Sequence, residues 1–189
     1  MGFLSRDDLM DLGFAKLGLN VLVSDRASLY GCARISIGDN VRVDDFCVLS
    51  AGEGGIEIGN YIHLGVYSSL IGAGKIVLED FCGISSRVSV YSSNDDYSGQ
   101  SMTNPTVPEE FTNVQHADVT IGRHAIIGAG SVILPGVILG QGVVVGALSL
   151  VTKSCQDYGV YSGTPARFIK ERKKNFVQLE QLLRVQSAE

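Results

Sequence analysis

The sequence predicts an all-β fold, a left-handed parallel β-helix of hexapeptide repeats with a short N-terminal helix, an extended loop and a C-terminal helix. Apolar residues recur at every sixth position over long stretches. Glycine is abundant and proline is scarce, with 23 and 4 residues among 189. An α-helix would repeat at about 3.6 residues and a half-buried strand at about 2. A step of six fits a short strand followed by a turn, and three such units close one coil of a parallel β-helix.

The repeat is clearest between Val119 and Val151. Stepping by six from Val119 reaches only small or aliphatic residues, and another apolar residue follows each of them two positions later. These repeat positions, called stops below, are Val119, Ala125, Ser131, Val137, Val143 and Ser149. Shorter runs with the same step begin at Ile35, Ile56 and Ile76, and the register shifts between runs as expected where a turn gains residues. Each coil buries its face only against its neighbours, and roughly six or seven coils fit in the chain.

The two ends of the chain differ from the repeat. We expect residues 1–20 to form a capping segment in which Ser5–Lys16 is a helix with Ser5 as its N-cap. The β-helix then spans residues 21–163. Residues 164–189 are expected to form a C-terminal helix that packs on a neighbouring subunit, because Pro165 suits a first helical turn and the apolar residues after it recur at helical spacing.

One long segment interrupts the repeat between Val90 and Asp118. It is polar and contains Pro105 and Pro108. A long irregular loop inside a compact domain is commonly functional. We therefore expect residues 91–118 to form an extended loop that contributes a wall of the active site.

Composition narrows the classes of function. The net charge of −5 argues against nucleic acid as the main partner. No apolar run has the length needed to span a membrane, and the N-terminus lacks a signal-peptide core. The four cysteines match no zinc or redox spacing, and Cys47 and Cys82 fall on the apolar register, so they are predicted to be buried thiols. These features predict a cytoplasmic protein.

The segment from Asp118 to Arg172 contains the series VTIGRHAIIGAGSVILPGVILGQGVVVGALSLVTKS and then YSGTPARFIKER. This series resembles the hexapeptide-repeat acyltransferases, in particular galactoside, maltose and xenobiotic O-acetyltransferases and sugar acetyltransferases of surface-polysaccharide biosynthesis. The resemblance implies a homotrimer with active sites between subunits and acetyl-CoA as the acyl donor. It also implies O-acetylation of a sugar or nucleotide-linked sugar, with N-acetylation of an amino sugar as the alternative.

The resemblance also implies a binding region for the cofactor. Small side chains at Ala129 and Ala147 leave a slot for the pantetheine arm of CoA, and cationic or hydroxyl side chains meet its phosphates. The residues expected to do so are Thr152, Lys153, Arg167 and Lys170. Five basic residues lie between Arg167 and Lys174, which fits a phosphate-rich cofactor, although Arg172, Lys173 and Lys174 also fit a solvated basic helix face.

Catalysis needs a base near the acceptor, and the resemblance implies a histidine early in the extended loop. Here that place holds Asn94 and Asp95 instead. The candidate catalytic residues are therefore His63, His116, Asp95 and Asn94, whereas His124 lies at a turn and is expected to be structural. A carboxylate is a weak base for a hydroxyl, so Asp95 would serve an amine better.

Two other classes of function remain open at this stage. A γ-carbonic-anhydrase-like zinc enzyme shares the coil and needs three converging histidines, and the spacing of the three histidines in this chain does not match it. A non-enzymatic β-helix scaffold would not need Lys153, the GTPAR segment and the basic residues together.

Overall fold

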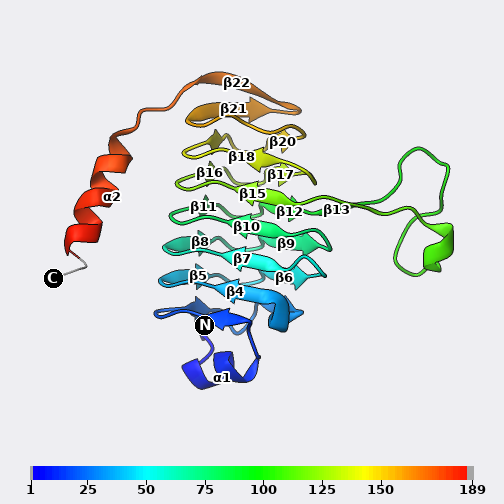
Figure 1. Ribbon diagram of the computed structural model, residues 1–189, viewed down its shortest axis with the longest axis horizontal. Helices are drawn as coiled ribbons and strands as arrows, with labels where there is room; N and C mark the ends of the chain where they lie inside the picture. Colours follow the sequence, from blue (N-terminus) through cyan, green and yellow to red (C-terminus); the bar gives the residue numbers. More distant parts are fainter. Residues whose placement is uncertain (1, 187–189) are drawn as a thin grey trace.

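The computed structural model describes residues 2–186 and is a parallel β-helix with three sheets (Figure 1). Sheet 1 contains β1 (Lys16–Leu17), β4 (Ile35–Ile37), β7 (Ile56–Ile58), β10 (Ile76–Leu78), β15 (Val119–Ile121) and β18 (Ile138–Leu139). Sheet 2 contains β2 (Leu22–Val23), β5 (Val41–Val43), β8 (Ile62–Leu64), β11 (Gly83–Ile84), β16 (Ile126–Ile127), β19 (Val144–Val145), β21 (Gly159–Gly163) and β22 (Ala166–Glu171). Sheet 3 contains β3 (Ser28–Tyr30), β6 (Val48–Ala51), β9 (Ser69–Gly72), β12 (Ser89–Tyr91), β17 (Val132–Ile133) and β20 (Leu150–Val151). The predicted β-helix is confirmed.

The chain passes from sheet 1 to sheet 2 to sheet 3 in each coil, so the β-helix has three corners, named here corner 1–2, corner 2–3 and corner 3–1. Between successive coils, Ile121 pairs with Leu139 and Ile127 with Val145, so the later coils repeat every 18 residues. Earlier coils are longer because residues 52–55 and 73–75 lengthen corner 3–1, which explains the register shifts seen in the sequence.

The predicted inward positions form the core. All six stops of the repeat between Val119 and Ser149 are at most 2% exposed. The buried serines stay hydrogen-bonded, as buried polar groups generally are: the Ser131 and Ser149 hydroxyls both donate to the carbonyl of Gly146. Cys47 and Cys82 are buried as predicted, and burial raises the pKa of their thiols to about 11 and about 12.

The N-terminal helix is shorter than expected. Ser5 caps α1 (Arg6–Asp11) and shares a reciprocal capping box with Asp8, so the predicted cap is confirmed. The helix does not reach Lys16. Gly13 follows it with a φ of 69°, a left-handed conformation that ends helices, and Lys16 belongs to β1.

The prediction of a C-terminal helix over residues 164–189 is wrong for the first part of that range. Residues 166–171 form β22, which pairs antiparallel with β21, satisfies the otherwise open edge of that strand and becomes the last strand of sheet 2. Helix α2 begins later and covers Asn175–Gln186. Its side chains at Leu179, Leu182 and Val185 are more than 60% exposed in the single chain. The remaining positions of the predicted helix, 187–189, lie outside the described residues.

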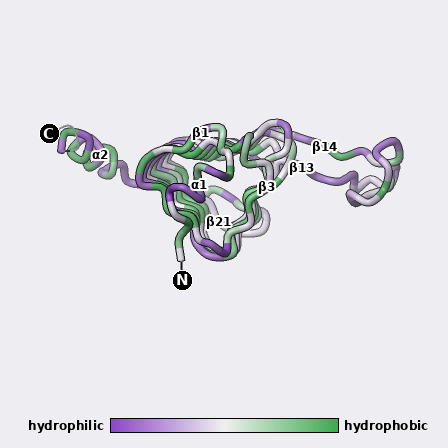
Figure 2. Tube along the Cα trace, turned by 90° about the horizontal axis from the view of Figure 1, so that it is seen from below, coloured by the Kyte–Doolittle hydropathy of each residue, from purple (hydrophilic) through white to green (hydrophobic). Residues whose placement is uncertain are grey.

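Two segments project from the β-helix on opposite sides (Figures 1 and 2). Helix α2 lies beside the edge formed by corner 1–2. The loop leaves corner 3–1 through β13 (Ser93–Asn94), makes a short 3-10 turn at Glu109–Phe111 (η2) and returns through β14 (Gln115–His116). A second 3-10 turn, η1 (Cys32–Arg34), precedes β4. Among residues 2–186, no helix is both long and apolar enough to cross a membrane.

Candidate functional site

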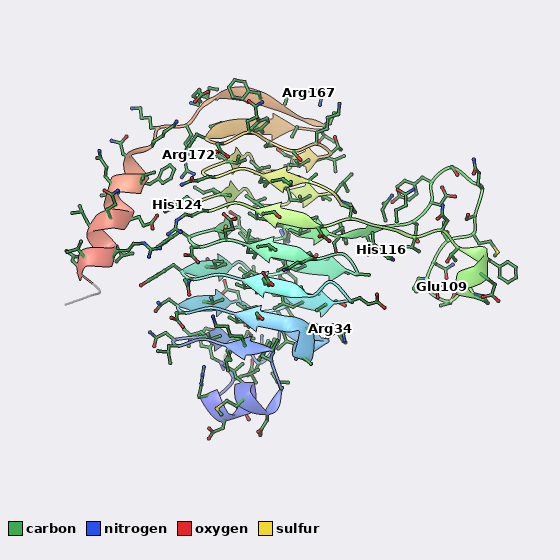
Figure 3. All side chains as sticks on the ribbon, viewed as in Figure 1. Arg34, Glu109, His116, His124, Arg167 and Arg172 are labelled. Atoms are coloured by element: carbon green, nitrogen blue, oxygen red, sulfur yellow. The ribbon has the colours of Figure 1, made fainter. Side chains whose placement is uncertain are left out.

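The three histidines lie in three different places and pair with three different residues. His63 contacts Asp44, His116 contacts Ser93 and His124 contacts Glu180. Figure 3 shows His116 at the base of the projecting loop and His124 on the side of the β-helix that faces α2. A single chain therefore does not bring the histidines together as a zinc enzyme of the γ-carbonic-anhydrase type would require.

His63 points outward from β8, because its neighbours Ile62 and Leu64 point into the core. Its Nε2 atom lies 2.8 Å from Oδ2 of Asp44, and Nε of Arg42 donates to the other carboxylate oxygen at 2.7 Å. Burial raises the pKa of Asp44, but the hydrogen bonds and charges of His63 and Arg42 outweigh it and hold that pKa below its ordinary value. A carboxylate that orients an imidazole is a common support for a general base.

A hollow of about 320 Å³ adjoins His63 on the outer face of sheet 2. Its lining comprises Asp44, His63, Gly65, Gly83, Ile84, Ser85, Ser86 and Ile126. The buried hydroxyl of Ser68 donates to the carbonyl of Ser85 at 2.9 Å and so fixes the backbone at this edge of the hollow. The side-chain hydroxyls of Ser85 and Ser86 have no hydrogen-bond partner within residues 2–186.

A column of small residues rises from this hollow along corner 2–3. Strand register places Ile84 beside Ile127, Ile127 beside Val145 and Val145 beside Tyr161. The residues two positions later therefore stack in one column: Ser86, Ala129, Ala147 and Gly163. Ala129 and Ala147, the predicted slot, are both exposed. The column spans three strand spacings, about 14 Å.

The predicted phosphate-binding residues are divided between two corners. Arg167 lies near the start of β22, opposite Ser162, and so stands next to Gly163 at the upper end of the small-residue column. Figure 3 shows Arg167 at the top of the β-helix. Lys170 lies further along β22, opposite Val160, and is exposed. Thr152 and Lys153 follow β20 and lie exposed at corner 3–1, so one chain does not place them on the column.

Arg172 and Lys174 have structural contacts. Nη1 of Arg172 donates to the carbonyls of His124 and Gly142 at 2.8 and 3.1 Å, and its guanidinium lies 4.3 Å from the ring centroid of Phe176. Burial lowers the pKa of Arg172. Nζ of Lys174 lies 4.0 Å from the ring centroid of Tyr158. Arg172 and Lys174 therefore hold the start of α2 against the last coils. This role differs from both roles expected from the sequence, a phosphate site and a solvated basic helix face.

The loop begins and ends at one place, as its sequence position indicated. Ser93 pairs with His116 and Asn94 with Gln115 in β13–β14. Nδ1 of His116 lies 2.7 Å from the Ser93 hydroxyl, which also accepts the backbone N–H of Ala73 at 2.7 Å. His116 therefore fastens the loop base to the β-helix. Asn94 is half-buried and donates to the backbone carbonyl of Asp95.

His124 is structural, as expected from its turn position. Its ring stacks on Phe81 at 4.9 Å and packs against Phe176 of α2 at 4.8 Å, and Phe81 stacks on Tyr61. Tyr61, Phe81 and His124 all have φ near 60°, because each occupies the same turn position at corner 1–2. His124 is thus part of an aromatic column that carries α2.

Sequence reasoning missed Asp44, Gly83 and Ser85. A usable signal existed for Asp44: it comes just after one coil's sheet 2 strand, and His63 lies in the same strand of the next coil. Gly83 and Ser85 carry no signal as single residues, since only the register shows that they border His63.

Comparisons with known proteins agree with this architecture. The family described as bacterial transferase hexapeptide (six repeats) matches residues 118–153. A dTDP-4-amino-4,6-dideoxy-D-glucose acyltransferase of Escherichia coli is 54% identical over 97% of this chain and 96% of its own length. A chloramphenicol acetyltransferase of Agrobacterium fabrum is 32% identical over 53% of this chain and 54% of its own.

Solved structures are similar as well. The crystal structure of AntD, an N-acyltransferase from Bacillus cereus in complex with dTDP and 3-hydroxybutyryl-CoA, has a TM-score of 0.93 and 43% identity, and the match covers 99% of this chain and 98% of AntD. The fold, the small-residue column and these relatives lead to one conclusion: the chain is an acyltransferase that belongs to the bacterial hexapeptide transferase family.

Proposed function

We propose that this enzyme transfers an acyl group from a coenzyme A thioester to the amino group of a dTDP-linked amino sugar. The observation that carries the proposal is the 54% identity, along almost the whole of both chains, to an acyltransferase named for a dTDP-4-amino sugar. The AntD structure, which holds dTDP and an acyl-CoA, supports the same pair of substrates. Of the two acceptors considered from the sequence, the amine is therefore favoured over the hydroxyl.

The chemistry fits the side chains at the hollow. The acceptor nitrogen forms a bond to the thioester carbon, the carbon–sulfur bond breaks, and one proton passes from nitrogen to the departing thiolate. A neutral amine attacks without prior loss of a proton, so a modest base is enough. We assign this base to His63, because Asp44 orients its ring beside the hollow.

The donor would lie along corner 2–3. Ala129 and Ala147 leave room for the pantetheine arm, and Arg167 at the top of the column suits the phosphates at the nucleotide end. Lys170 is a second cation on the same strand. We propose that the enzyme assembles as a homotrimer, in which Thr152 and Lys153 would reach the same donor from corner 3–1 of another subunit.

The extended loop also favours a site between subunits. It leaves corner 3–1 through β13 and projects away from its own β-helix (Figure 1), whereas the hollow is lined by residues of sheet 2 and corner 2–3. We propose that the loop reaches a neighbouring copy, where Asp95 binds the acceptor amine and Asn94 supports it. His116, fastened to Ser93, holds the loop at its base rather than taking part in catalysis.

The proposed substrates and the four free thiols agree with a cytoplasmic enzyme. The nucleotide diphosphate activates the sugar for glycosyl transfer. The reaction that consumes the product is therefore a glycosyl transfer, and a surface polysaccharide is the destination we propose.

The direct test supplies the purified enzyme with acetyl-CoA or 3-hydroxybutyryl-CoA and dTDP-4-amino-4,6-dideoxyglucose, with product detection by mass spectrometry. The matched acceptor carries a hydroxyl in place of the 4-amino group. We expect an amide product and at least 100-fold lower kcat/KM for the hydroxyl acceptor. Comparable rates on both acceptors would instead indicate O-acylation, and failure to bind any acyl-CoA in calorimetry would favour a scaffold.

Variants then test the assigned residues. Replacing a general base lowers rates by about 10² or more, so His63→Ala should reduce kcat about 100-fold with little change in the KM for the donor. Asp44→Asn should reduce kcat about tenfold, because it only orients His63. Asp95→Asn should mainly raise the KM for the acceptor. Loss of turnover in His116→Ala with normal turnover in His63→Ala would show that the two roles are reversed.

A further inference from the structure

Gly83 is unusual among the glycines of the β-helix. It lies inside sheet 2, between His63 of β8 and Ile126 of β16. A Cβ atom at Gly83 would meet no heavy atom within 4 Å, and its φ lies outside the left-handed region. Neither packing within the chain nor backbone conformation therefore requires glycine at this position.

Most glycines along sheet 2 and its corners have an evident reason. A Cβ atom at Gly65 would lie 2.8 Å from the backbone nitrogen of Ser86, and one at Gly128 would lie 2.4 Å from that of Ala147. A glycine within a strand weakens it and often marks a place where a ligand approaches the backbone closely. Gly83 fits that description, because the space that its missing side chain leaves open belongs to the hollow beside His63.

The walls of this hollow differ in character. Ile126 presents an apolar side chain that is 40% exposed, and His63 and Asp44 form the opposite, polar wall. The free hydroxyls of Ser85 and Ser86 line the edge toward corner 2–3. Its volume of about 320 Å³ is at the low end of ligand pockets, which suits one group of a substrate rather than a whole molecule.

The position of the hollow indicates which group of the substrate it would hold. It opens at the lower end of the column that runs from Arg167 to Ser86, so a donor with its phosphates near Arg167 places its thioester near Ser86. The acyl chain continues beyond the thioester, and the gap at Gly83 is the space directly beside it.

We propose that the Gly83 gap is the acyl subsite and admits a short chain longer than acetyl, of the 3-hydroxyacyl type. The carbons of the chain would pack on Ile126, and its hydroxyl would meet the free hydroxyl of Ser85. Gly83 then determines acyl-chain specificity. This inference rests on the proposed use of an acyl-CoA donor.

The test compares the wild type with Gly83→Val, using kcat/KM for 3-hydroxybutyryl-CoA and acetyl-CoA at a fixed concentration of the amino-sugar acceptor. Valine suits a strand and its Cβ atom meets no neighbour, so the variant is expected to fold. Val144→Ile is the matched control, because it adds bulk on the same outer face one coil beyond Ile126. Thermal unfolding and size-exclusion chromatography verify the folding and assembly of both variants.

We expect Gly83→Val to lower kcat/KM for 3-hydroxybutyryl-CoA at least tenfold and kcat/KM for acetyl-CoA less than threefold. In Val144→Ile the ratio of kcat/KM between the two donors should stay at the wild-type value. An equal loss for both donors, or no loss for either, would overturn the acyl subsite. A wild type that uses acetyl-CoA only would overturn it too and leave N-acylation intact. A wild type that acylates no amino sugar with any donor would instead contradict the proposed function.

Discussion

Glu180 is predicted to control how firmly α2 is held on the β-helix. Its carboxylate accepts hydrogen bonds from Nε of Arg123 at 3.0 Å, Nε of Arg184 at 2.6 Å and, when that nitrogen carries a proton, Nε2 of His124 at 2.6 Å. The Glu180 side chain is 12% exposed. Phe176, which packs on His124 and under the Arg172 guanidinium, also holds α2 on the β-helix. Glu180→Gln removes the charge and keeps the size.

The magnitude follows from the pKa of this carboxyl. The hydrogen bond from Arg123, with smaller contributions from Arg184 and His124, outweighs burial and lowers the pKa of Glu180 from 4.5 to about 2. At about 1.4 kcal/mol for each pKa unit, this difference corresponds to ~3 kcal/mol between ionised and neutral forms. Solvent at the rim of the cluster screens the charges, so we expect about half of this difference to appear in docking. Glu180→Gln should therefore weaken the docking free energy of α2 by ~1.5 kcal/mol. That is about a tenfold change in the docking equilibrium.

Hydrogen exchange measures this directly. Amides of α2 in Glu180→Gln should exchange about tenfold faster than in the wild type, whereas amides of the core strands keep their rates. Glu171→Gln, an exposed carboxylate on β22, is the control. Unchanged exchange in α2 of Glu180→Gln would refute the assigned contribution. Because folding lowers the pKa of Glu180, the stabilisation of α2 docking by its carboxylate is complete above pH 4.5 and is lost as the pH falls toward 2.

Three further predictions concern other parts of the chain. Arg167→Ala should raise the KM for the acyl-CoA donor about tenfold with little change in kcat in steady-state kinetics, because Arg167 is the cation that we propose for the phosphate end of the donor. An unchanged KM would remove Arg167 from the proposed donor site. Ile84→Ala should lower the free energy of unfolding by about 2–5 kcal/mol in denaturant titrations, because Ile84 is 1% exposed in the core; a loss below about 1 kcal/mol would contradict tight packing there. Burial raises the pKa of the Cys82 thiol to about 12, so Cys82 should resist iodoacetamide at pH 8 in the folded protein while the half-buried Cys32 reacts first. Peptide mass spectrometry measures the labelling, and equal labelling of the two cysteines would contradict the burial of Cys82.

The β-helix could be predicted because its information is local and repeated. A residue such as Ala125 or Ser131 is small for a reason that recurs in each coil, so the step of six is visible without any long-range contact. The two terminal helices were harder to delimit. Residues 166–171 carry no feature that excludes a helix, and they form a strand because β21 offers an open edge, which is a property of the fold and not of that segment.

The candidate site was less predictable for a related reason. His63 stands out as a residue type, but its value depends on Asp44, one coil earlier, and on the missing side chain of Gly83, one coil later. Longer turns at corner 3–1 change the spacing between coils, so the register cannot be counted reliably from the sequence. His116 shows the reverse case: its position at the end of the loop suggested catalysis, and its contact with Ser93 indicates a role in fastening the loop.

The three corners of the β-helix carry different tasks, and this division follows from their side chains. Corner 1–2 stacks large rings, Tyr61, Phe81 and His124, which fill the surface and hold α2. Corner 2–3 stacks small residues in the later coils, which leaves backbone accessible to an extended ligand. Corner 3–1 contains the additional residues 52–55 and 73–75, and the extended loop leaves the β-helix there. Enlarging Ala129 or Ala147 should therefore impair binding of the proposed donor at corner 2–3, although both side chains are exposed and a larger one would not disturb the core.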